Sequence, residues 1–279
     1  MAYKDLLVQI DDTKACQSRI DAAIDLACRF DAHLTGLYLV PEIILPVAAA
    51  GYISADLYGD IQQQEKERAE IALDRFRQAA EAKDVEFNTR IDQGTIADFP
   101  ILFSVHSRYA DLSIIGQTNH EDMVPSTPEP QDVVLTSGAP VLITPFVGAP
   151  SGFGGRAMVA WNASREAARA VRDAMPFLEQ SQSVDLVTFR PKSSQGAHGE
   201  LPGADIALHL TRHRINVDVQ QLEGTDIDVG NALLSHIADR GSDLGVMGGY
   251  GHSRLREVVL GGATRTILHS MTVPVLMAH

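Results

Sequence analysis

Residues 242–248 read Ser-Asp-Leu-Gly-Val-Met-Gly, and residues 110–116 read Ala-Asp-Leu-Ser-Ile-Ile-Gly. Both are apolar runs with only small polar interruptions, a pattern typical of strands that are covered on both faces of a parallel sheet. Because an internal repeat marks a structural unit that recurs along a chain, it outweighs any single local pattern. The two stretches therefore predict that the same α/β unit occurs twice.

Three further landmarks recur in the same order in both halves of the chain. They pair residues 6–11 with 157–162, residues 93–95 with 223–225, and residues 139–143 with 273–277. In each copy a hydroxyl residue that can cap a helix, Thr13 or Ser164, follows the first landmark. Four matches in order predict two tandem domains, residues 1–147 and residues 153–279. The segment 148–155, rich in Gly, Pro and Ser, is expected to link them.

Between the landmarks, short β-branched runs alternate with longer helical patterns. Strands are expected at 4–10, 33–40, 85–91, 111–116, 140–145, 156–161, 184–189, 216–222, 243–248 and 274–278. Helices are expected at 14–30, 60–82, 95–109, 130–137, 164–178, 201–214, 226–240 and 263–271. The alternation implies two doubly wound, Rossmann-like α/β domains, each a mainly parallel five-stranded sheet flanked by helices. Such sheets bind ligands beyond the carboxyl ends of their strands, so the loops after the first and fourth strands are candidate sites.

The composition narrows the class of partner and the compartment. The 279-residue chain carries a formal net charge of −13 and no block of Lys or Arg, so nucleic acid is not expected as a partner. No apolar run approaches the roughly 20 residues of a membrane span, and no signal peptide is indicated. Cys16 and Cys28 lie on one predicted helix, roughly 18 Å apart, and so cannot bridge each other. These features predict a cytoplasmic protein.

The loop after the fourth strand of the second copy is where binding chemistry is expected. Residues 248–264 read Gly-Gly-Tyr-Gly-His-Ser-Arg-Leu-Arg-Glu-Val-Val-Leu-Gly-Gly-Ala-Thr. The glycines let the backbone turn tightly and approach a ligand closely. A helix that starts near Ala263 would aim its free N–H groups and its dipole at the same place, which favours a phosphate. The segment therefore predicts an anion cradle at the carboxyl edge of the sheet.

This loop resembles the ATP-loop signature of the universal stress protein family. Two residues separate Gly248 from Gly251, and nine more lead to Gly261. Residues 254–260 and 272–276 are similar to the same family, and the similarity covers both copies. The resemblance implies a stress-response role, ATP or another adenine nucleotide as ligand with Mg²⁺ accompanying it, and at most slow hydrolysis. It also implies that the fifth strands pair into an intramolecular pseudo-dimer, while a homodimer and a protein partner stay open.

The resemblance carries the family's nucleotide contacts onto this chain residue by residue. The end of the first strand of the second copy would contact adenine, and the glycine loop with the turn after it would hold the phosphates. These residues are Ala160, Trp161, Asn162, Met247, Gly248, Gly251, Gly261, Gly262, Ala263 and Thr264. Two of them depart from the family pattern. Gly262 replaces Ser or Thr, which leaves Thr264 to offer a hydroxyl, and Asn162 replaces an acid with an amide that can still hydrogen-bond.

The first copy departs further from the family pattern. Gly116 is followed by Gln-Thr-Asn without a second glycine, and residues 125–130 bring prolines and an acid instead of a glycine pair. Asp11 keeps the acid at the end of the first strand. A second site around Ile10, Asp11 and Gly116 is expected to hold a different small ligand or none. The departures in both copies keep a rival function open, a nucleotide-free module that acts through protein partners.

Several other residues have both a functional and a structural interpretation. His209 and His213 share a face of a predicted helix, which suits a metal site or a solvated surface. Residues 252–256 bring a histidine and two arginines that could meet a phosphate, or could remain on the surface with the arginines paired to Glu257. Trp161 could stack on a base or fill the core.

The remaining features give no sign of catalysis. No Ser-His-Asp, Cys-His or paired-carboxylate constellation is present at a readable spacing, and Asp243 is interpreted as a residue at a strand edge. No catalytic residue is therefore expected, and the sequence does not require an enzyme. The apolar insertion from Ile43 to Tyr58 could form a lid, a partner-binding patch or a loop packed on its own domain.

Overall fold

The structure is a computed structural model, which describes residues 2–42, 55–119, 127–147, 152–190, 203–223, 229–250 and 261–279. Its first copy contains β1 (Asp5–Ile10), α1 (Cys16–Phe30), β2 (His33–Pro41), α2 (Ala55–Glu81), β3 (Phe87–Gly94), the 3₁₀ turn η1 (Ile96–Asp98), α3 (Phe99–Ser107), β4 (Leu112–Gly116), α4 (Pro130–Thr136) and β5 (Val141–Thr144). Its second copy contains β6 (Arg156–Trp161), α5 (Arg165–Leu178), β7 (Ser183–Arg190), α6 (Ala204–Arg212), β8 (Val217–Glu223), α7 (Val229–Arg240), β9 (Leu244–Gly248), α8 (Gly261–Ser270) and β10 (Val275–Ala278).

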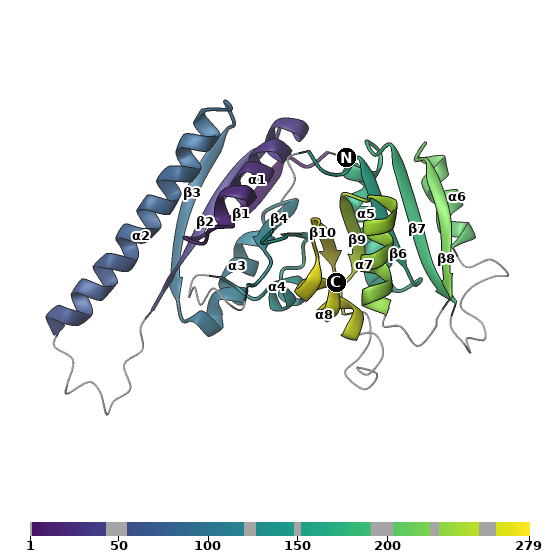
Figure 1. Cartoon of the computed structure of the whole chain (residues 1–279). Coiled ribbons are helices and arrows are strands. Elements are labelled where there is room, and N and C mark those ends of the chain that lie inside the picture. The colour runs from purple at the N-terminus through teal and green to yellow at the C-terminus, as the bar shows by residue number, and fades with distance from the viewer. Residues whose placement is uncertain are drawn as a thin grey trace.

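The strands of both copies join into one ten-stranded sheet, in the order β3-β2-β1-β4-β5-β10-β9-β6-β7-β8 (Figure 1). Pairing is parallel within each copy, and the second half of the order repeats the first half in reverse. The α/β, doubly wound fold predicted from the alternation of strands and helices is confirmed. Each copy contributes its first strand, β1 or β6, to the centre of its own half-sheet.

The two half-sheets meet through their fifth strands, as predicted. β5 and β10 pair antiparallel, with Leu142 opposite Leu276 and Val141 opposite Met277. All four of these side chains are buried. The pairing relates the two copies as an approximate dimer within a single chain.

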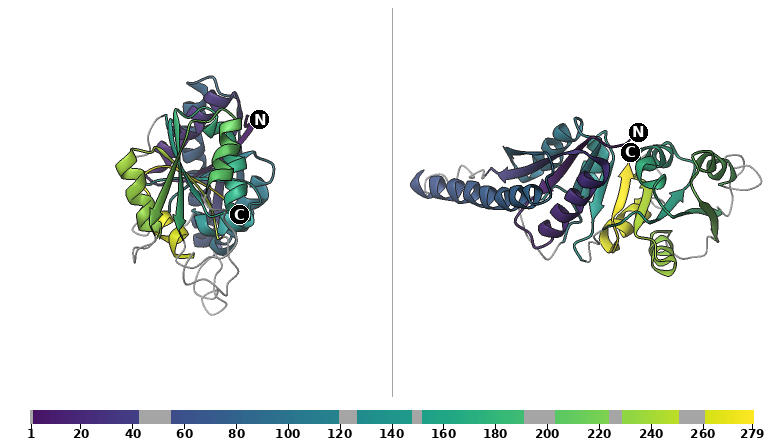
Figure 2. Two further views of the ribbon diagram at one scale, coloured as in Figure 1. Left: turned by 90° about the vertical axis from the view of Figure 1, so that its right-hand side faces the viewer. Right: turned by 90° about the horizontal axis from the view of Figure 1, so that it is seen from above.

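Helices cover both faces of the sheet, and each face has its own buried apolar cluster (Figure 2). One cluster lies between the sheet and α1, α2, α5 and α6. The other lies between the sheet and α3, α4, α7 and α8. Because both clusters contain residues of both copies, the hydrophobic core is continuous across the β5–β10 pairing.

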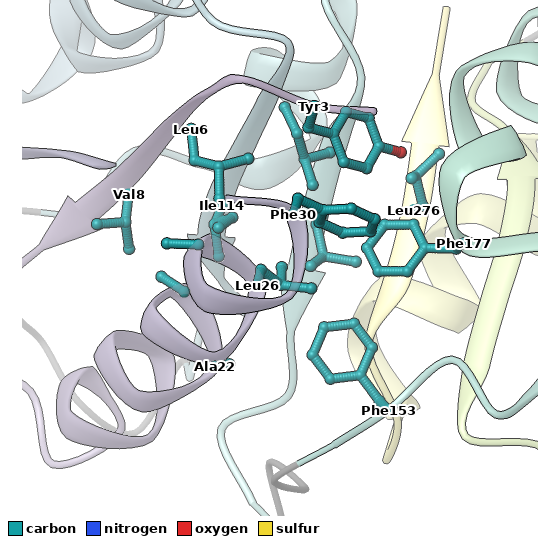
Figure 3. Packing of buried hydrophobic residues seen from close by; sticks show 14 of the residues in the cluster. Tyr3, Leu6, Val8, Ala22, Leu26, Phe30, Ile114, Phe153, Phe177 and Leu276 are labelled. Atoms are coloured by element: carbon teal, nitrogen blue, oxygen red, sulfur yellow. The ribbon is translucent and has the colours of Figure 1, made fainter. Parts of the chain in front are cut away.

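An aromatic group joins the two copies beside α1 and α5 (Figure 3). The ring of Phe30 stands edge-on to Tyr3, at 5.0 Å between centroids, and to Phe177, at 5.5 Å. Phe153 packs against Phe177 at 5.8 Å between ring centroids, and the Tyr3 hydroxyl donates to the backbone oxygen of Asp173 at 2.6 Å. The end of the predicted linker is therefore part of the core, because Phe153 lies within it.

Two predicted helices differ from the structure for identifiable reasons, and a third begins earlier than expected. The helix expected over 95–109 is divided into η1 and α3, because Pro100 lacks an N–H and is accommodated in the first turn of a helix. The helix expected over 201–214 is α6, which is shorter, because Gly203 and Arg214 at its two ends have positive φ angles. The helix expected to start at residue 60 begins at Ala55.

The last change also corrects the interpretation of the insertion. Residues 55–58 are the first turn of α2, so this part of the segment from Ile43 to Tyr58 is helical and is not a loop. Residues 43–54 lie outside the described part of the chain. Within the described ranges, no helix combines the length and the apolar character that a membrane span requires.

Candidate functional site

The carboxyl edge of β6 and β9 is the switch point of the second half-sheet. β6 is followed by its neighbour β7 on one side. β9, its neighbour on the other side, is followed by β10 in the opposite direction. Ala160 of β6 stands opposite Met247 of β9, and Gly248 stands opposite Ala278 of β10. Doubly wound sheets bind ligands at such a point, because the diverging connections leave a crevice there. The structure thus brings together the strand ends that the sequence singled out.

Gly248 is held against the first turn of α5. A side chain on Gly248 would place its Cβ 2.5 Å from the backbone nitrogen of Ala167 and 2.6 Å from the carbonyl carbon of Glu166. Both are backbone atoms, which cannot rotate away. The glycine is therefore required by the close approach of β9 to α5, independently of any ligand.

The connection from β6 to α5 is fixed by its own polar groups. The Ser164 hydroxyl caps α5 by accepting from the backbone N–H of Ala167 at 3.1 Å, as the sequence predicts. The Asn162 side-chain oxygen accepts from the backbone N–H of Ser164 at 3.0 Å. Asn162 is exposed, and Ala163 after it has a φ of 56°, which a residue with a side chain seldom adopts. The amide nitrogen of Asn162 is the group left to donate to a base or a ribose.

α8 starts at this same edge of the sheet. Because β9 and β10 are parallel, the helix that connects them runs back along the sheet and begins beyond the carboxyl end of β9. Gly261, Gly262, Ala263 and Thr264 form its first turn. Ala263 and Thr264 are buried, at 4% and 2% exposed, while Gly262 is exposed. The first N–H groups of a helix have no partner within that helix, and those of α8 lie at the edge of the sheet where a phosphate is expected.

The first turn of α8 is also packed closely on α7. A side chain on Gly230 would place its Cβ 2.5 Å from the Cβ of Thr266 and 3.1 Å from the backbone oxygen of Ala263. Gly251, the middle glycine of the motif, lies outside the described residues, as do His252, Arg254, Arg256 and Glu257.

Two further side chains define the surroundings of this edge. Trp161 is partly exposed and packs against the apolar cluster beneath α5, so one side of the indole belongs to the core. Glu166 is a buried carboxylate in the first turn of α5, 6% exposed, and its Cβ would lie 2.9 Å from a Cβ on Gly248. Glu166 could not be singled out from the sequence, because an acid near the start of a helix is ordinary and gives no sign of burial.

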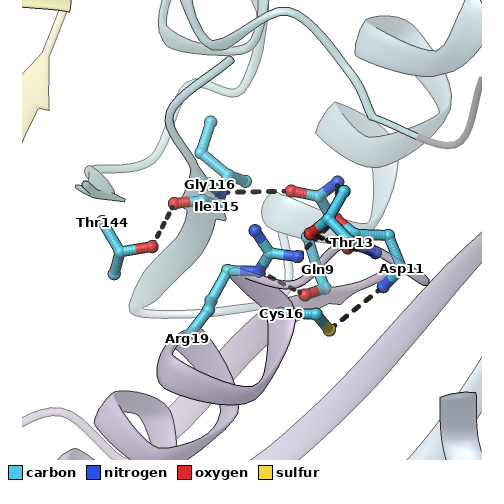
Figure 4. Close-up of polar contacts among 8 residues, drawn as sticks. All are labelled: Gln9, Asp11, Thr13, Cys16, Arg19, Ile115, Gly116 and Thr144. Atoms are coloured by element: carbon cyan, nitrogen blue, oxygen red, sulfur yellow. Dashed lines mark hydrogen bonds and ion pairs between the residues drawn. The ribbon is translucent and has the colours of Figure 1, made fainter. Parts of the chain in front are cut away.

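The corresponding point in the first copy is filled by an arginine from the protein itself (Figure 4). The Nε of Arg19, on α1, donates to the backbone oxygen of Gln9 at 2.8 Å, and its guanidinium forms an ion pair with Asp11. The Arg19 and Asp11 side chains are 2% and 0% exposed. Any side chain on Gly116 would overlap the guanidinium. The candidates Asp11 and Gly116 do meet, but they meet around Arg19.

The network that surrounds Arg19 satisfies its polar groups. The amide of Gln9 donates to Asp11 at 3.1 Å and accepts from the backbone N–H of Gly116 at 3.2 Å. The other oxygen of Asp11 accepts from the Thr13 backbone N–H at 2.9 Å and from its hydroxyl. Burial alone would lower the pKa of the Arg19 guanidinium, but the charge of Asp11 outweighs it and raises that pKa above its ordinary value.

The repeat shows what the second copy has in the same places. Ser164 corresponds to Thr13, and three positions further along α1 and α5 the residues are Cys16 and Ala167. Arg19 accordingly corresponds to Ala170, a buried alanine. The second copy thus has no long side chain at the position from which Arg19 fills the crevice of the first.

The other candidates have structural partners. Asp243 accepts from the backbone N–H groups of Gly154, Gly155 and Arg156 at 2.9–3.1 Å, which confirms its role at a strand edge. His213 lies 3.6 Å from Glu179, an acid that sequence spacing did not place beside it, and its ring meets that of His209 at 5.0 Å. Within the described ranges, no group of three or more His, Cys, Asp or Glu side chains could hold a metal ion.

The second copy is similar in sequence to a known protein family. Residues 155–279 match the universal stress protein family. The second copy belongs to the universal stress protein family. No curated protein matches this chain by sequence.

The tandem fold of this chain is shared by solved structures. A universal stress protein from Archaeoglobus fulgidus DSM 4304 covers 98% of this chain and 96% of its own, with a TM-score of 0.72 and 18% identity. A protein of unknown function from Pseudomonas aeruginosa PAO1 covers 99% and 92%, with a TM-score of 0.60 and 14% identity. At these identities the similarity establishes the fold, in which two copies of the α/β unit are joined in one chain.

Proposed function

We propose that this universal stress protein binds one adenine nucleotide, ATP being the first candidate, at the carboxyl edge of β6 and β9. The observation that carries the proposal is the contrast between the two copies at the same point of the fold. The first copy fills this point with Arg19, whereas the second has Ala170 there and begins α8 at the same edge.

Each part of a nucleotide has a suitable group at this edge. The partly exposed indole of Trp161 offers a face to adenine, and the Asn162 amide offers donors to the base or the ribose. The buried carboxylate of Glu166 can accept from ribose hydroxyls. The N–H groups at the start of α8 can hold phosphate oxygens. Mg²⁺ would arrive on the phosphates, because the described residues offer no carboxylate cluster of their own.

The role that follows is that of a ligand-dependent regulator in a stress response. Within the described ranges we identify no general base beside the proposed phosphate position, so any hydrolysis would be slow. Output through a protein partner would be consistent with this role. We infer a cytoplasmic location from the sequence features alone.

The single tryptophan makes the test direct, since Trp161 lies at the proposed site. Titration with ATP, ADP and AMP should change its fluorescence and saturate at one nucleotide per chain. Gly251→Val should abolish the change if the loop approaches the phosphates. Gly59→Ala, on the exposed side of α2 with no atom within 4 Å of its Cβ, is the control and should bind as the wild type does. Analysis of small molecules released from denatured protein would identify a ligand that co-purifies.

One observation favours the rival, a nucleotide-free interaction module. Ile101, Val105 and Tyr109 follow each other at four-residue spacing along α3 and the turn after it, and they are 56%, 42% and 78% exposed. An apolar stripe of this kind suits contact with another protein. Absence of any fluorescence change, together with no heat on titration with millimolar ATP, would refute the nucleotide proposal and leave the interaction module.

A further inference from the structure

The first copy holds one end of the helix whose other end forms the proposed phosphate site. Gln117, directly after β4, donates from its side-chain nitrogen to the backbone oxygens of Leu268 at 2.9 Å and His269 at 3.0 Å. Both oxygens belong to the last turn of α8. The last four carbonyls of a helix have no partner within the helix, so Gln117 caps two of them.

Gln117 is itself fixed on the first copy. Its side-chain oxygen accepts from the backbone N–H of Phe146 at 3.2 Å, and its own backbone N–H donates to Thr144 at 2.8 Å. The residue is 5% exposed. Every polar group of the side chain is thus engaged, two bonds toward the second copy and one toward the first. Gln117 is therefore held in place at the carboxyl ends of β4 and β5.

α8 connects the contact with Gln117 to the proposed phosphate site. The helix has ten residues, which corresponds to a rod about 15 Å long. Its first turn supplies the N–H groups for the phosphates, and its last turn rests on Gln117. A displacement at the capped end therefore moves or tilts the first turn, where ligand contacts depend on placement to within about an ångström.

The repeat shows that this contact is not reciprocal. The counterpart of Gln117 after β9 is Gly249, whose backbone N–H donates to Ala278 at 2.9 Å just as that of Gln117 donates to Thr144. A side chain on Gly249 would meet Val134 of α4, because its Cβ would lie 2.7 Å from the Cγ1 of that residue. Gly249 therefore offers α4 no side-chain donor. The cap that α8 receives from Gln117 of the opposite copy thus has no counterpart from Gly249 at α4.

The stem of the glycine loop also rests on the first copy. Gly249 packs on Val134, and the next residue, Tyr250, is half-buried, with its hydroxyl enclosed and without a hydrogen-bond partner among the described residues. Burial, with the nearby carboxylates of Asp132 and Glu129 on and before α4, raises the pKa of Tyr250 to about 12. Both ends of the segment from Tyr250 to Ser270 are thus placed against the first copy, one by α4 and one by Gln117.

We propose that the first copy acts as a positioning subunit for α8 of the second, and that Gln117 is its main positioning residue. The proposal rests on the function proposed above for the second copy. The first copy would thereby contribute to the ligand affinity of the second copy, although its own crevice is filled by Arg19.

The test compares two variants that each remove a polar contact between the copies. Gln117→Met keeps the length of the side chain and removes both donors to α8. Arg29→Met is the matched control, because it removes bonds from Arg29 to Gln180 and to the backbone oxygen of Phe153, at the amino edge of the sheet and away from α8. Both variants are measured by hydrogen exchange of residues 261–270 without ligand, by urea unfolding and by ATP titration of Trp161 fluorescence.

We expect Gln117→Met to speed exchange throughout α8 and to weaken ATP binding about tenfold, as the loss of the two hydrogen bonds allows. Arg29→Met should change neither quantity, even where it lowers stability by the same amount. Equal effects of the two variants, or an unchanged α8 in Gln117→Met, would overturn the proposal. If the wild type binds no adenine nucleotide, the functional proposal fails, and the exchange comparison alone decides whether Gln117 positions α8.

Discussion

The buried ion pair in the first copy predicts a large effect from a single substitution. Arg19→Met replaces the guanidinium with an apolar side chain of similar length and leaves the Asp11 carboxylate buried without its cation. Removing one partner of a buried pair destabilises a protein by about 3–5 kcal/mol. Asp11 keeps its bonds from Gln9 and Thr13, so we expect a loss near the lower limit, about 3 kcal/mol.

Substitution of the partner charge, Asp11, tests whether the two residues act as a pair. Asp11→Asn leaves Arg19 buried with its bond to the Gln9 backbone oxygen and without the carboxylate, so it should cost a similar amount. The double variant removes both charges at once. We expect it to lie within about 1 kcal/mol of the wild type, since replacing both members of a buried pair is often close to neutral. The two single losses together then exceed the loss in the double variant by about 5 kcal/mol, which is the coupling energy expected from the cycle.

Urea unfolding followed by circular dichroism gives the four free energies of the cycle. Lys4→Met is the control, because Lys4 pairs with Asp31 at 2.9 Å but the two side chains are 58% and 99% exposed. A pair of that kind contributes less than about 1 kcal/mol. Losses below 1 kcal/mol in both single variants, or losses that simply add in the double variant, would show that Arg19 and Asp11 do not act as a buried pair.

Three further predictions follow from particular contacts. Gly248→Ala should lower the free energy of unfolding by about 1–3 kcal/mol, because its Cβ would meet the backbone of α5, whereas Gly59→Ala should raise it by about 0.5–1 kcal/mol; urea unfolding of the two variants checks both signs. Phe177→Ala should cost about 3–5 kcal/mol, measured in the same way, since the ring packs against both copies; a loss below 1 kcal/mol would contradict this. Burial would raise the pKa of Asp185, but Arg240 and His236 outweigh it and lower that pKa. The stability that Asp185 contributes is therefore present above about pH 4, and it is lost as the pH falls through the pKa of Asp185 in the folded state. Thermal melts should therefore show the deficit of Asp185→Asn shrinking between pH 7 and pH 3, and a constant deficit would refute the assignment.

Much of the fold could be predicted because its signals are local and repeated. The apolar runs that became β4 and β9 lie between helical patterns, and this order leaves few topologies other than a doubly wound sheet. The antiparallel pairing of β5 with β10 followed from the family resemblance. The divided helix at Pro100 shows the limit, because a helical pattern does not specify where the chain turns before the helix proper.

The polar interior of the first copy could be predicted less well. Arg19 lies on the buried side of α1 with Cys16, Ile20, Ala23 and Ala27, so a charge on an apolar helix face was the available signal. Its partner Asp11 is on a different element, and the sequence does not show which side chains face each other across a loop. The role of Gln117 was harder still to predict, because it depends on a contact with α8, which is distant in the sequence.

Removing Arg19 is not expected to recreate a phosphate site in the first copy. α4, the counterpart of α8, has only seven residues, and Glu129 and Asp132 stand at its start, where their charges oppose a phosphate. Arg19→Ala would open the crevice at the end of β1 without supplying the N–H groups and the positive field that the second copy has at α8. Equilibrium dialysis should therefore find one nucleotide per chain in both the wild type and Arg19→Ala. A second nucleotide in the variant would mean that the arginine alone closes the first copy, and that the acids of α4 are no barrier to binding.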